Sequence, residues 1–190
     1  AQYSLGRMYL RGDGVDKDEK QAVNWIHMAA EGGLPVAQAE YGMRFIKGDG
    51  VSQDAAEGAK WLQRAAEQGH AVSQMNLGLL YLQGQGVEKN EAEAARWCMM
   101  AAEQGLASAQ EKLGLMYELG RGVQKDPVAA RAWYVIAESR GSSRAAERRT
   151  NIEADMSDDQ KHASDVQVAH WQDRHQHAAA TAPAAPRKSE

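Results

Sequence analysis

The chain has 190 residues, of which 43% are hydrophobic and 25% are charged, which is the range of a folded globular protein. Its formal net charge is −4, and it has neither the basic stripe of a nucleic-acid-binding protein nor an apolar run long enough to span a membrane. We therefore expect no nucleic-acid partner and no membrane insertion. Ala, Glu, Gln, Met and Leu are plentiful, whereas Pro and β-branched residues are few, and this composition favours helix throughout.

The sequence repeats itself with a period of 36 residues. Tryptophans and glycines recur in register at Trp25, Trp61, Trp97 and Trp133 and at Gly6, Gly42, Gly78 and Gly114. A Gly-x-Gly-Val turn recurs as Gly12–Val15, Gly48–Val51, Gly84–Val87 and Gly120–Val123. A fixed period of this length is typical of a solenoid, in which each unit is too small to be stable alone and stacks on its neighbours.

Each unit is predicted to form two helices, called helix A and helix B below. In the first unit, helix A carries an apolar stripe formed by Ala1, Leu5, Met8 and Tyr9. The two glycines of the turn then end it, since glycine tolerates the left-handed conformation of a tight reversal. Helix B opens in the four units at the N-cap residues Asp18, Asp54, Asn90 and Asp126. Its stripe in the first unit is Ala22, Trp25, Ile26 and Ala29, and it ends in the four units at Gly33, Gly69, Gly105 and Gly141.

The glycine inside every helix A needs a separate explanation, because an interior glycine costs about 1 kcal/mol relative to alanine. We expect a steric reason, namely that the missing side chain lets a neighbouring helix approach closely. The tryptophan of helix B is expected to fill the space above this glycine.

The repeats are predicted to end in a cap. Ala145 matches the opening Ala of a fifth unit, but Arg149 and Thr150 replace its Leu and Gly, so this helix has become polar as a terminal helix should. Ser157 and Gln160 form a capping box that opens one more helix. The residues of that helix expected to cover the last repeat are Ala163, Val166, Ala169 and Trp171.

The predicted organisation is four repeats over 1–36, 37–72, 73–108 and 109–142, capping helices over 143–177, and a flexible Ala/Pro-rich tail over 178–190. The first helix has no such cap, because Ala1 already lies within it. We expect that further repeats or a capping helix precede Ala1, or that another chain covers this side.

These motifs resemble the Sel-one-like repeat (SLR) family, a relative of the tetratricopeptide repeat. The shared pattern is A-x-x-x-L-G-x-x-Y, G-x-G-V, D-x-x-x-A-x-x-W and A-A-E-x-G, over residues 1 to about 142. The resemblance implies an all-α fold, a right-handed α/α solenoid, and a role as a scaffold or adaptor. It also implies a bacterial protein and favours the periplasm over the cytoplasm. The sequence departs from the pattern at Tyr41, Arg44, Gly58 and Glu138.

In this family helix A lines the concave face of the solenoid, and three positions of each helix A lie opposite its core stripe. The candidate partner-binding residues there are Tyr3, Arg7, Leu10, Met43, Ile46, Met75, Leu79, Leu82, Glu111, Leu115 and Glu118. Because the two middle repeats are apolar along this row, we expect a groove for a peptide or a partner helix, with charge at its ends setting polarity. The alternative is that adjacent A helices bury much of this arc.

Other candidate sites have simpler explanations. The Gly-x-Gly turns lack the strand and the Lys-Ser/Thr of a phosphate-binding loop, and the acidic turn around Asp16 lacks the ligand spacing of a calcium loop. Four histidines near the end could suggest a metal site: His162, His170, His175 and His177. They show no repeated ligand spacing, even though Asp173 lies four residues before the last of them. Cys98 has no neighbouring base in the sequence. We expect no catalytic residue, no metal and no cofactor.

The function predicted from the sequence is therefore a protein-interaction scaffold. One alternative is a regulatory subunit of a larger envelope assembly, docked through the Ala1 end, and another is self-association through the uncapped first helix. A third is a hydrolase, which would require a clustered nucleophile, base and orienting group. The sequence offers no such cluster, since helix capping, turns and packing account for nearly every recurrent residue.

Overall fold

The computed structural model describes the backbone of residues 1–181 and the side chains of residues 1–175. Within this range the chain forms ten α-helices and no strand. They are α1 (Gln2–Arg11), α2 (Glu19–Glu31), α3 (Pro35–Lys47), α4 (Ala55–Glu67), α5 (Ala71–Gln83), α6 (Glu91–Glu103), α7 (Ala107–Leu119), α8 (Pro127–Ser139), α9 (Ser143–Glu153) and α10 (Asp158–Thr181). The predicted all-α solenoid is confirmed.

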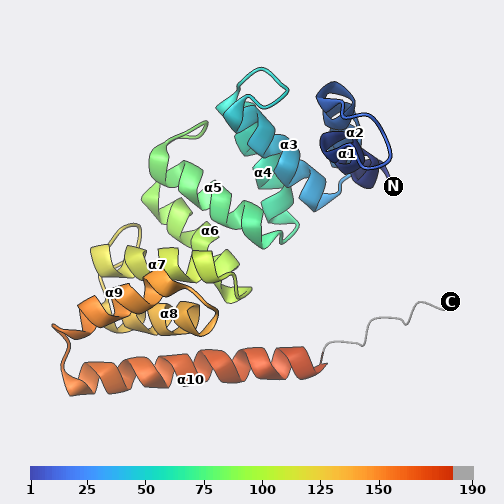
Figure 1. Ribbon diagram of the computed structural model, residues 1–190. Coiled ribbons are helices and arrows are strands. Elements are labelled where there is room, and N and C mark those ends of the chain that lie inside the picture. Colours follow the sequence, from blue (N-terminus) through green and yellow to red (C-terminus); the bar gives the residue numbers. More distant parts are fainter. Residues whose placement is uncertain (182–190) are drawn as a thin grey trace.

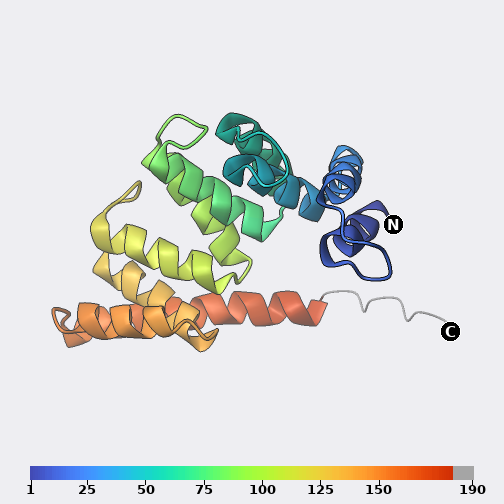
Figure 2. The same cartoon turned by 45° about the horizontal axis from the view of Figure 1, so that its top comes forward.

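The first eight helices form four A–B pairs that follow one another along an arc (Figure 1). Each helix B packs both on its own helix A and on helix A of the next repeat. The long helix α10 lies along the last pair and runs back under the array (Figure 2). No helix in the described part of the chain is both long and apolar enough to cross a membrane.

Local sequence signals place the helix ends where they were predicted. The side chains of Asp18, Asp54, Asn90 and Asp126 each accept a hydrogen bond from a backbone N–H in the first turn of helix B. Pro127 occupies the start of α8, where its missing N–H costs nothing. Each helix B is therefore stabilised at its N-terminus by contacts within its own repeat.

The glycine inside helix A allows helix B to approach closely, as expected. A Cβ built on Gly42 would lie 2.8 Å from the carbonyl oxygen of Gly58, and one built on Gly114 would lie 2.6 Å from Cε1 of Tyr134. The expectation that tryptophan fills this space is wrong in three repeats, where the residue after the tryptophan faces the glycine. Only at Gly42 does the tryptophan contribute, through Cβ of Trp61 at 3.1 Å.

The tryptophans instead join consecutive repeats. Trp97 packs in one buried cluster with Ala65 and Ala66 of the preceding helix B, and Trp133 packs in another with Ala101 and Ala102. Trp61 packs in a third cluster with Ala29 and Ala30 of the preceding helix B, and its ring also meets Tyr41 of its own repeat edge-on at 5.3 Å. A large aromatic ring against an Ala-Ala pair buries apolar area while keeping the helices close.

Three departures from the repeat pattern have structural explanations. Arg44 is buried, forms an ion pair with Glu19 at 3.6 Å and donates to a backbone carbonyl. A Cβ on Gly58 would lie 2.7 Å from the carbonyl oxygen of Gly42, so α3 and α4 pack closely from both sides. Glu138 accepts a hydrogen bond from an arginine of α9 at 2.7 Å. These residues adjust local packing.

The cap has the expected helices but a different buried row. The capping box of α10 is confirmed, since Gln160 and Ser157 exchange side chain to backbone hydrogen bonds at 2.9 and 3.2 Å. The prediction that Ala163, Val166 and Ala169 cover the last repeat is wrong, because these three residues are exposed. The residues buried with Trp171 are instead Ser164 and Val168. The physical reason is helical periodicity, because residues three and seven positions before Trp171 share its face, whereas Ala163, Val166 and Ala169 do not.

The fifth A–B pair does not form as in the repeats, because α10 packs mainly on α8. Thr150 stands where helix A of every repeat has its glycine, so α9 lacks the residue that allows a helix B to approach closely. Helix α10 runs to Thr181, so the predicted start of the tail at residue 178 falls within its last turn. The rest of the predicted tail, 182–190, lies outside the described residues.

Candidate protein-binding face

The eleven predicted site residues all lie on A helices, and all are partly buried. In the first repeat they contact the next helix A and do not project into an open groove. The hydroxyl of Tyr3 donates to Oε2 of Glu40 at 2.8 Å, and Nη1 of Arg7 reaches the same oxygen at 3.2 Å. Burial and this carboxylate both raise the pKa of Tyr3.

Contacts between successive A helices continue along the array. Asn76 Nδ2 lies 3.7 Å from Met43 Sδ, and Ser108 Oγ lies 3.0 Å from Met75 Sδ. Three further residues of the row pack against buried clusters, namely Leu10, Ile46 and Leu82. The row therefore borders the junction between successive A helices, which supports the alternative that neighbouring helices bury part of this arc.

The charged residues at the far end of the row have partners within the chain. Glu111 accepts from the hydroxyl of Ser142 at 2.8 Å. Glu118 accepts from the hydroxyl of Tyr134 and lies 3.9 Å from Arg148. Burial, and then this hydrogen bond, raise the pKa of Tyr134. Because these charges are paired internally, they are less available to orient a partner than the sequence suggested.

The most exposed side of helix A lies next to the predicted row, and sequence analysis missed it. Val72 is 43% exposed and Leu119 is 48% exposed, and Val36 has a similar exposure. They share this side with Leu79 and Leu115, which belong to the predicted row. The signal was present in the spacing, because positions 72, 76, 79 and 83 form one helical stripe. We define the helix A face by the apolar residues Val36, Met43, Val72, Met75, Leu79, Leu115 and Leu119.

Helix α5, at the centre of this face, has an unusual composition. None of its residues from Ala71 to Gln83 is charged, whereas α3 and α7 each carry several charges. A partly exposed helix normally has a charged outer side. The helix A face is therefore least polar at its centre.

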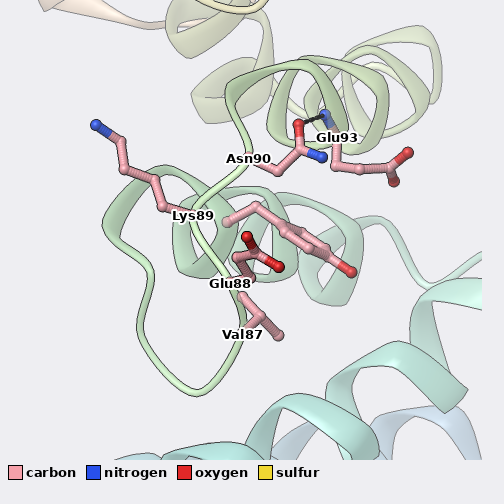
Figure 3. A pocket seen from close by; sticks show the side chains of 6 residues that line it. Val87, Glu88, Lys89, Asn90 and Glu93 are labelled. Carbon is pink, nitrogen blue, oxygen red and sulfur yellow. Dashed lines mark hydrogen bonds between the residues drawn. The ribbon is translucent and has the colours of Figure 1, made fainter.

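A cavity of about 500 Å³ lies at the turn of the third repeat and is lined by Tyr81, Val87, Glu88, Lys89, Asn90 and Glu93 (Figure 3). The corresponding cavity of the fourth repeat, about 620 Å³, has Tyr117, Val123, Lys125 and Asp126 at the equivalent positions. Because the cavity recurs at equivalent positions in two repeats, we attribute it to the shape of the turn and not to a specific ligand site. Two carboxylates and one amine in the third repeat do not suit a phosphate group.

The remaining candidates form no chemical site in the described part of the chain. No group of three or more His, Cys, Asp or Glu side chains there is placed to hold a metal ion. His175 contacts the carbonyl oxygen of Glu103, and the side chain of His177 lies outside the described residues. Cys98 is buried, and burial raises the pKa of its thiol to about 11, with a small opposing effect of Lys112. At neutral pH this thiol is not the thiolate that nucleophilic catalysis requires.

Comparison with solved structures identifies close likenesses. A Sel1 repeat protein from Oxalobacter formigenes is 38% identical, with a TM-score of 0.75, over 79% of this chain and 62% of its own. A protective antigen of uropathogenic Escherichia coli strains that displays an SLR fold is 32% identical, with a TM-score of 0.82, over 100% of this chain and 42% of its own. The cysteine-rich protein B of Helicobacter pylori, at 18% identity and a TM-score of 0.57, shares the fold alone. This chain thus spans less than two thirds of the first two proteins.

Among curated proteins none matches this sequence. The family model of the Sel1 repeat matches residues 1–34, 35–70, 71–106 and 107–142, in register with the four A–B pairs. Sel1-repeat proteins are generally protein-interaction scaffolds and are typically non-catalytic. With four matched repeats that account for α1 to α8, this chain belongs to the Sel1 repeat family.

Proposed function

We propose that this chain is a non-catalytic scaffold that binds a protein or peptide on the helix A face. The observation that carries the proposal is the set of apolar residues on this side of α3, α5 and α7, where Val36, Val72 and Leu119 are exposed and Met43, Leu79 and Leu115 are half-buried. Surface positions of this kind are normally polar, and contiguous exposed apolar patches mark interaction sites.

The chemistry of the face favours an apolar segment. Met43 and Met75 supply flexible, polarisable side chains that adapt to different shapes, and α5 offers no charge to a partner. A helix that presents apolar residues on one side, or an extended apolar peptide, suits such a surface. Binding strength would then come mainly from buried apolar area.

A double substitution tests the proposal. Met43→Asp with Leu79→Asp places two charges on the face, and we expect capture of the partner from the source cell to fall at least tenfold, which corresponds to about 1.4 kcal/mol. Helical circular dichroism and the melting temperature report whether the variant is folded. If the folded double mutant still captures every partner that the wild type captures, the helix A face is not the binding site.

The matched control is Met100→Asp. Met100 is 40% exposed on α6, a helix B, so the same charge is introduced away from the proposed site. Capture by this variant should equal that of the wild type. A photo-crosslinking residue at position 72 should also capture the partner, whereas one at position 100 should not.

We extend the proposal to the absence of an intrinsic activity. Cys98 is buried as a neutral thiol, and the recurrent residues of each repeat serve helix capping and packing. The hydrolase alternative would gain support from turnover of a substrate by the purified chain alone. It has no support from the side chains described.

Self-association or docking onto a larger assembly through the first repeat is a second candidate. Met8 and Trp25 are partly exposed, whereas their counterparts in the later repeats are buried. A second copy or another subunit could cover them as one repeat covers the next. Sedimentation velocity should then show a dimer at micromolar concentration that Trp25→Glu dissociates, and a monomer at all accessible concentrations would contradict this candidate.

A further inference from the structure

A ladder of buried glutamines links consecutive repeats. Gln74 is buried in α5, and its Nε2 donates to the carbonyl oxygen of Ala66 at 3.0 Å. Its Oε1 accepts from Nε2 of Gln104, at the end of α6, at 2.7 Å. Gln38 and Gln68 form the same arrangement one repeat earlier, again with a side chain to side chain distance of 2.7 Å. The amide nitrogen and the amide oxygen of the buried glutamine therefore both have hydrogen-bond partners in the second and third repeats.

The fourth repeat breaks this ladder. Gln110 is fully buried, and its Nε2 donates to the carbonyl oxygen of Ala102 at 3.0 Å, as in the other repeats. Its Oε1, however, has no hydrogen-bond partner. The position of the missing donor, 36 residues after Gln104, is occupied by Arg140. A buried amide oxygen without a partner is rare and costs free energy.

Arg140 carries suitable donors but points elsewhere. Its guanidinium lies over the ring of Trp171, 5.1 Å from the ring centre, and next to the backbone of Gly105. Trp171 belongs to α10 and packs edge-on against Trp133 of α8. The docked position of α10 thus gives Arg140 a cation–π partner and leaves the oxygen of Gln110 unpaired.

Other buried polar atoms in the interface of α10 also lack a hydrogen-bond partner. Ser164 Oγ and Trp171 Nε1 are buried without a hydrogen-bond partner. A cavity of about 190 Å³ lies between α8 and α10, against Trp133 and Ile136. Polar contacts hold this helix near its two ends, namely the ion pair between Asp165 and Arg131 at 2.6 Å and the contact of His175 Nε2 with the carbonyl oxygen of Glu103, also at 2.6 Å. A helix with unpaired buried polar atoms and a cavity at its interface is expected to open locally before the helices that it covers.

We propose that α10 is a releasable strap and that Arg140 has two alternative partners. When α10 is docked, Arg140 stacks on Trp171. When α10 is released, Arg140 donates to Gln110 Oε1 as Gln104 does to Gln74, which completes the ladder and offsets part of the lost docking contacts. Release uncovers the side chains of Trp133 and Ile136 on α8, which α10 covers when it is docked.

Hydrogen exchange of the full chain tests the strap. In the wild type, the amides of α10 should exchange through an opening that leaves α7 and α8 protected. Arg140→Gln removes the cation–π contact and supplies the donor found in the other repeats. We expect the rate of amide exchange in α10 to rise roughly two- to fivefold, which corresponds to the loss of one exposed cation–π contact. Amide exchange at the start of α7 should become slower.

The matched control is Gln68→Arg, in a repeat that α10 does not reach. An arginine at this position has no counterpart of Trp171 with which to form a cation–π contact. It should therefore keep the hydrogen bond to Gln38 and leave amide exchange in α3 and α10 unchanged. Three outcomes would overturn the proposal: α10 exchanging together with α7 and α8 in the wild type, unchanged exchange of α10 in Arg140→Gln, or no slowing in α7. Arg140 is exposed, and glutamine stands at its position in two other repeats, so this variant should fold.

Discussion

Replacing Gly122 with alanine is expected to lower the free energy of unfolding by roughly 2–5 kcal/mol, the sum of left-handed backbone strain and overpacking. Gly122 has φ +69°, and a Cβ built on it would lie 1.8 Å from the carbonyl oxygen of Glu91. That oxygen belongs to the first residue of α6, in the preceding repeat. A backbone atom cannot move aside as a flexible side chain can, so the fourth repeat would have to shift away from the third.

The same contact recurs one repeat earlier. A Cβ on Gly86 would lie 2.1 Å from the carbonyl oxygen of Ala55, the first residue of α4. The turn of each of these repeats therefore rests on the start of the preceding helix B. The second glycine of the Gly-x-Gly turn serves the junction between repeats as well as the turn itself.

Gly14→Ala is the matched control for this prediction. Gly14 has φ +73°, but the nearest atom to a Cβ there is the flexible Cε of Met8, at 3.9 Å. Only the conformational strain of about 1–2 kcal/mol should appear. Chemical denaturation of both variants measures the difference, and equal losses at the two positions would show that the contact with the preceding repeat is unimportant.

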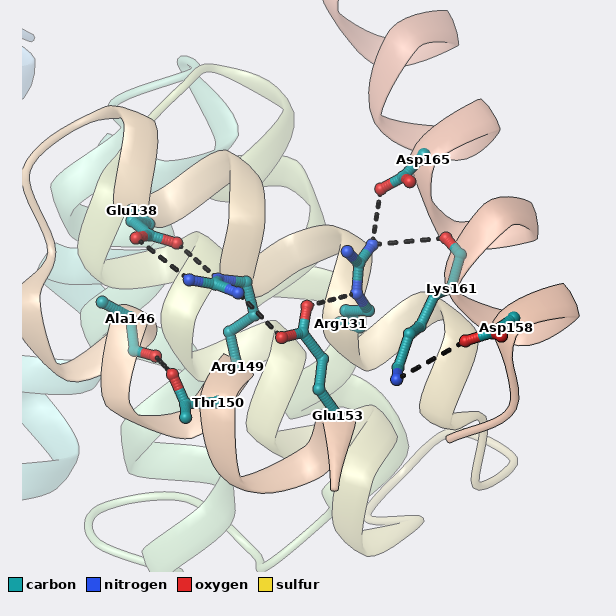
Figure 4. Close-up of polar contacts among 9 residues, drawn as sticks. All are labelled: Arg131, Glu138, Ala146, Arg149, Thr150, Glu153, Asp158, Lys161 and Asp165. Carbon is teal, nitrogen blue, oxygen red and sulfur yellow. Dashed lines mark hydrogen bonds and ion pairs between the residues drawn. The ribbon is translucent and has the colours of Figure 1, made fainter. Parts of the chain in front are cut away.

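Arg131→Met is expected to lower the free energy of unfolding by about 2–4 kcal/mol and to loosen the cap first. The Arg131 side chain is 11% exposed, with Nε 2.7 Å from Glu153 of α9 and Nη1 2.6 Å from Asp165 of α10 (Figure 4). One guanidinium thus ties both capping helices to α8. Methionine retains most of the apolar stem but leaves Glu153 with one partner fewer in a partly buried position.

The charge state of Glu153 supplies a second readout. Burial alone would raise the pKa of this carboxyl, but hydrogen bonds from Arg131 and Arg149 outweigh it and lower the pKa. A lowered folded-state pKa contributes stability above the ordinary Glu range, and this contribution is lost as the pH falls through the folded-state value. The difference in free energy of unfolding between the wild type and Arg131→Met should therefore become smaller below about pH 4.

Lys60→Met is the control for this second prediction. Lys60 pairs with Glu57 at 3.1 Å, but its side chain is 68% exposed, so the loss should be about 0.5 kcal/mol or less. Hydrogen exchange in α9 and α10 should rise in Arg131→Met and stay unchanged in Lys60→Met. Equal effects of the two variants would show that the network does not hold the cap.

The candidate site shows where sequence reasoning succeeds and where it stops. The row of Met43, Leu79 and Leu115 was identified by spacing, because residues on one side of a helix follow from its period. Which part of that side stays exposed depends on where the next helix A lies. The spacing also placed Val72 and Leu119 on this side of their helices, but the tilt between neighbouring helices decides that they stay exposed, and this tilt is not encoded in either helix alone.

Local chemistry determined the repeat itself. The N-cap Asp54 and the left-handed Gly84 act within a few residues of their own position, so the sequence alone placed the turns and helix ends. Tertiary packing decided the rest. The register of α10 follows from the fit of Val168 and Trp171 on α8, and Gln110 lost its partner because Trp171 attracts Arg140. Such choices depend on contacts between residues distant in the sequence, whose energies exist only once the helices have stacked.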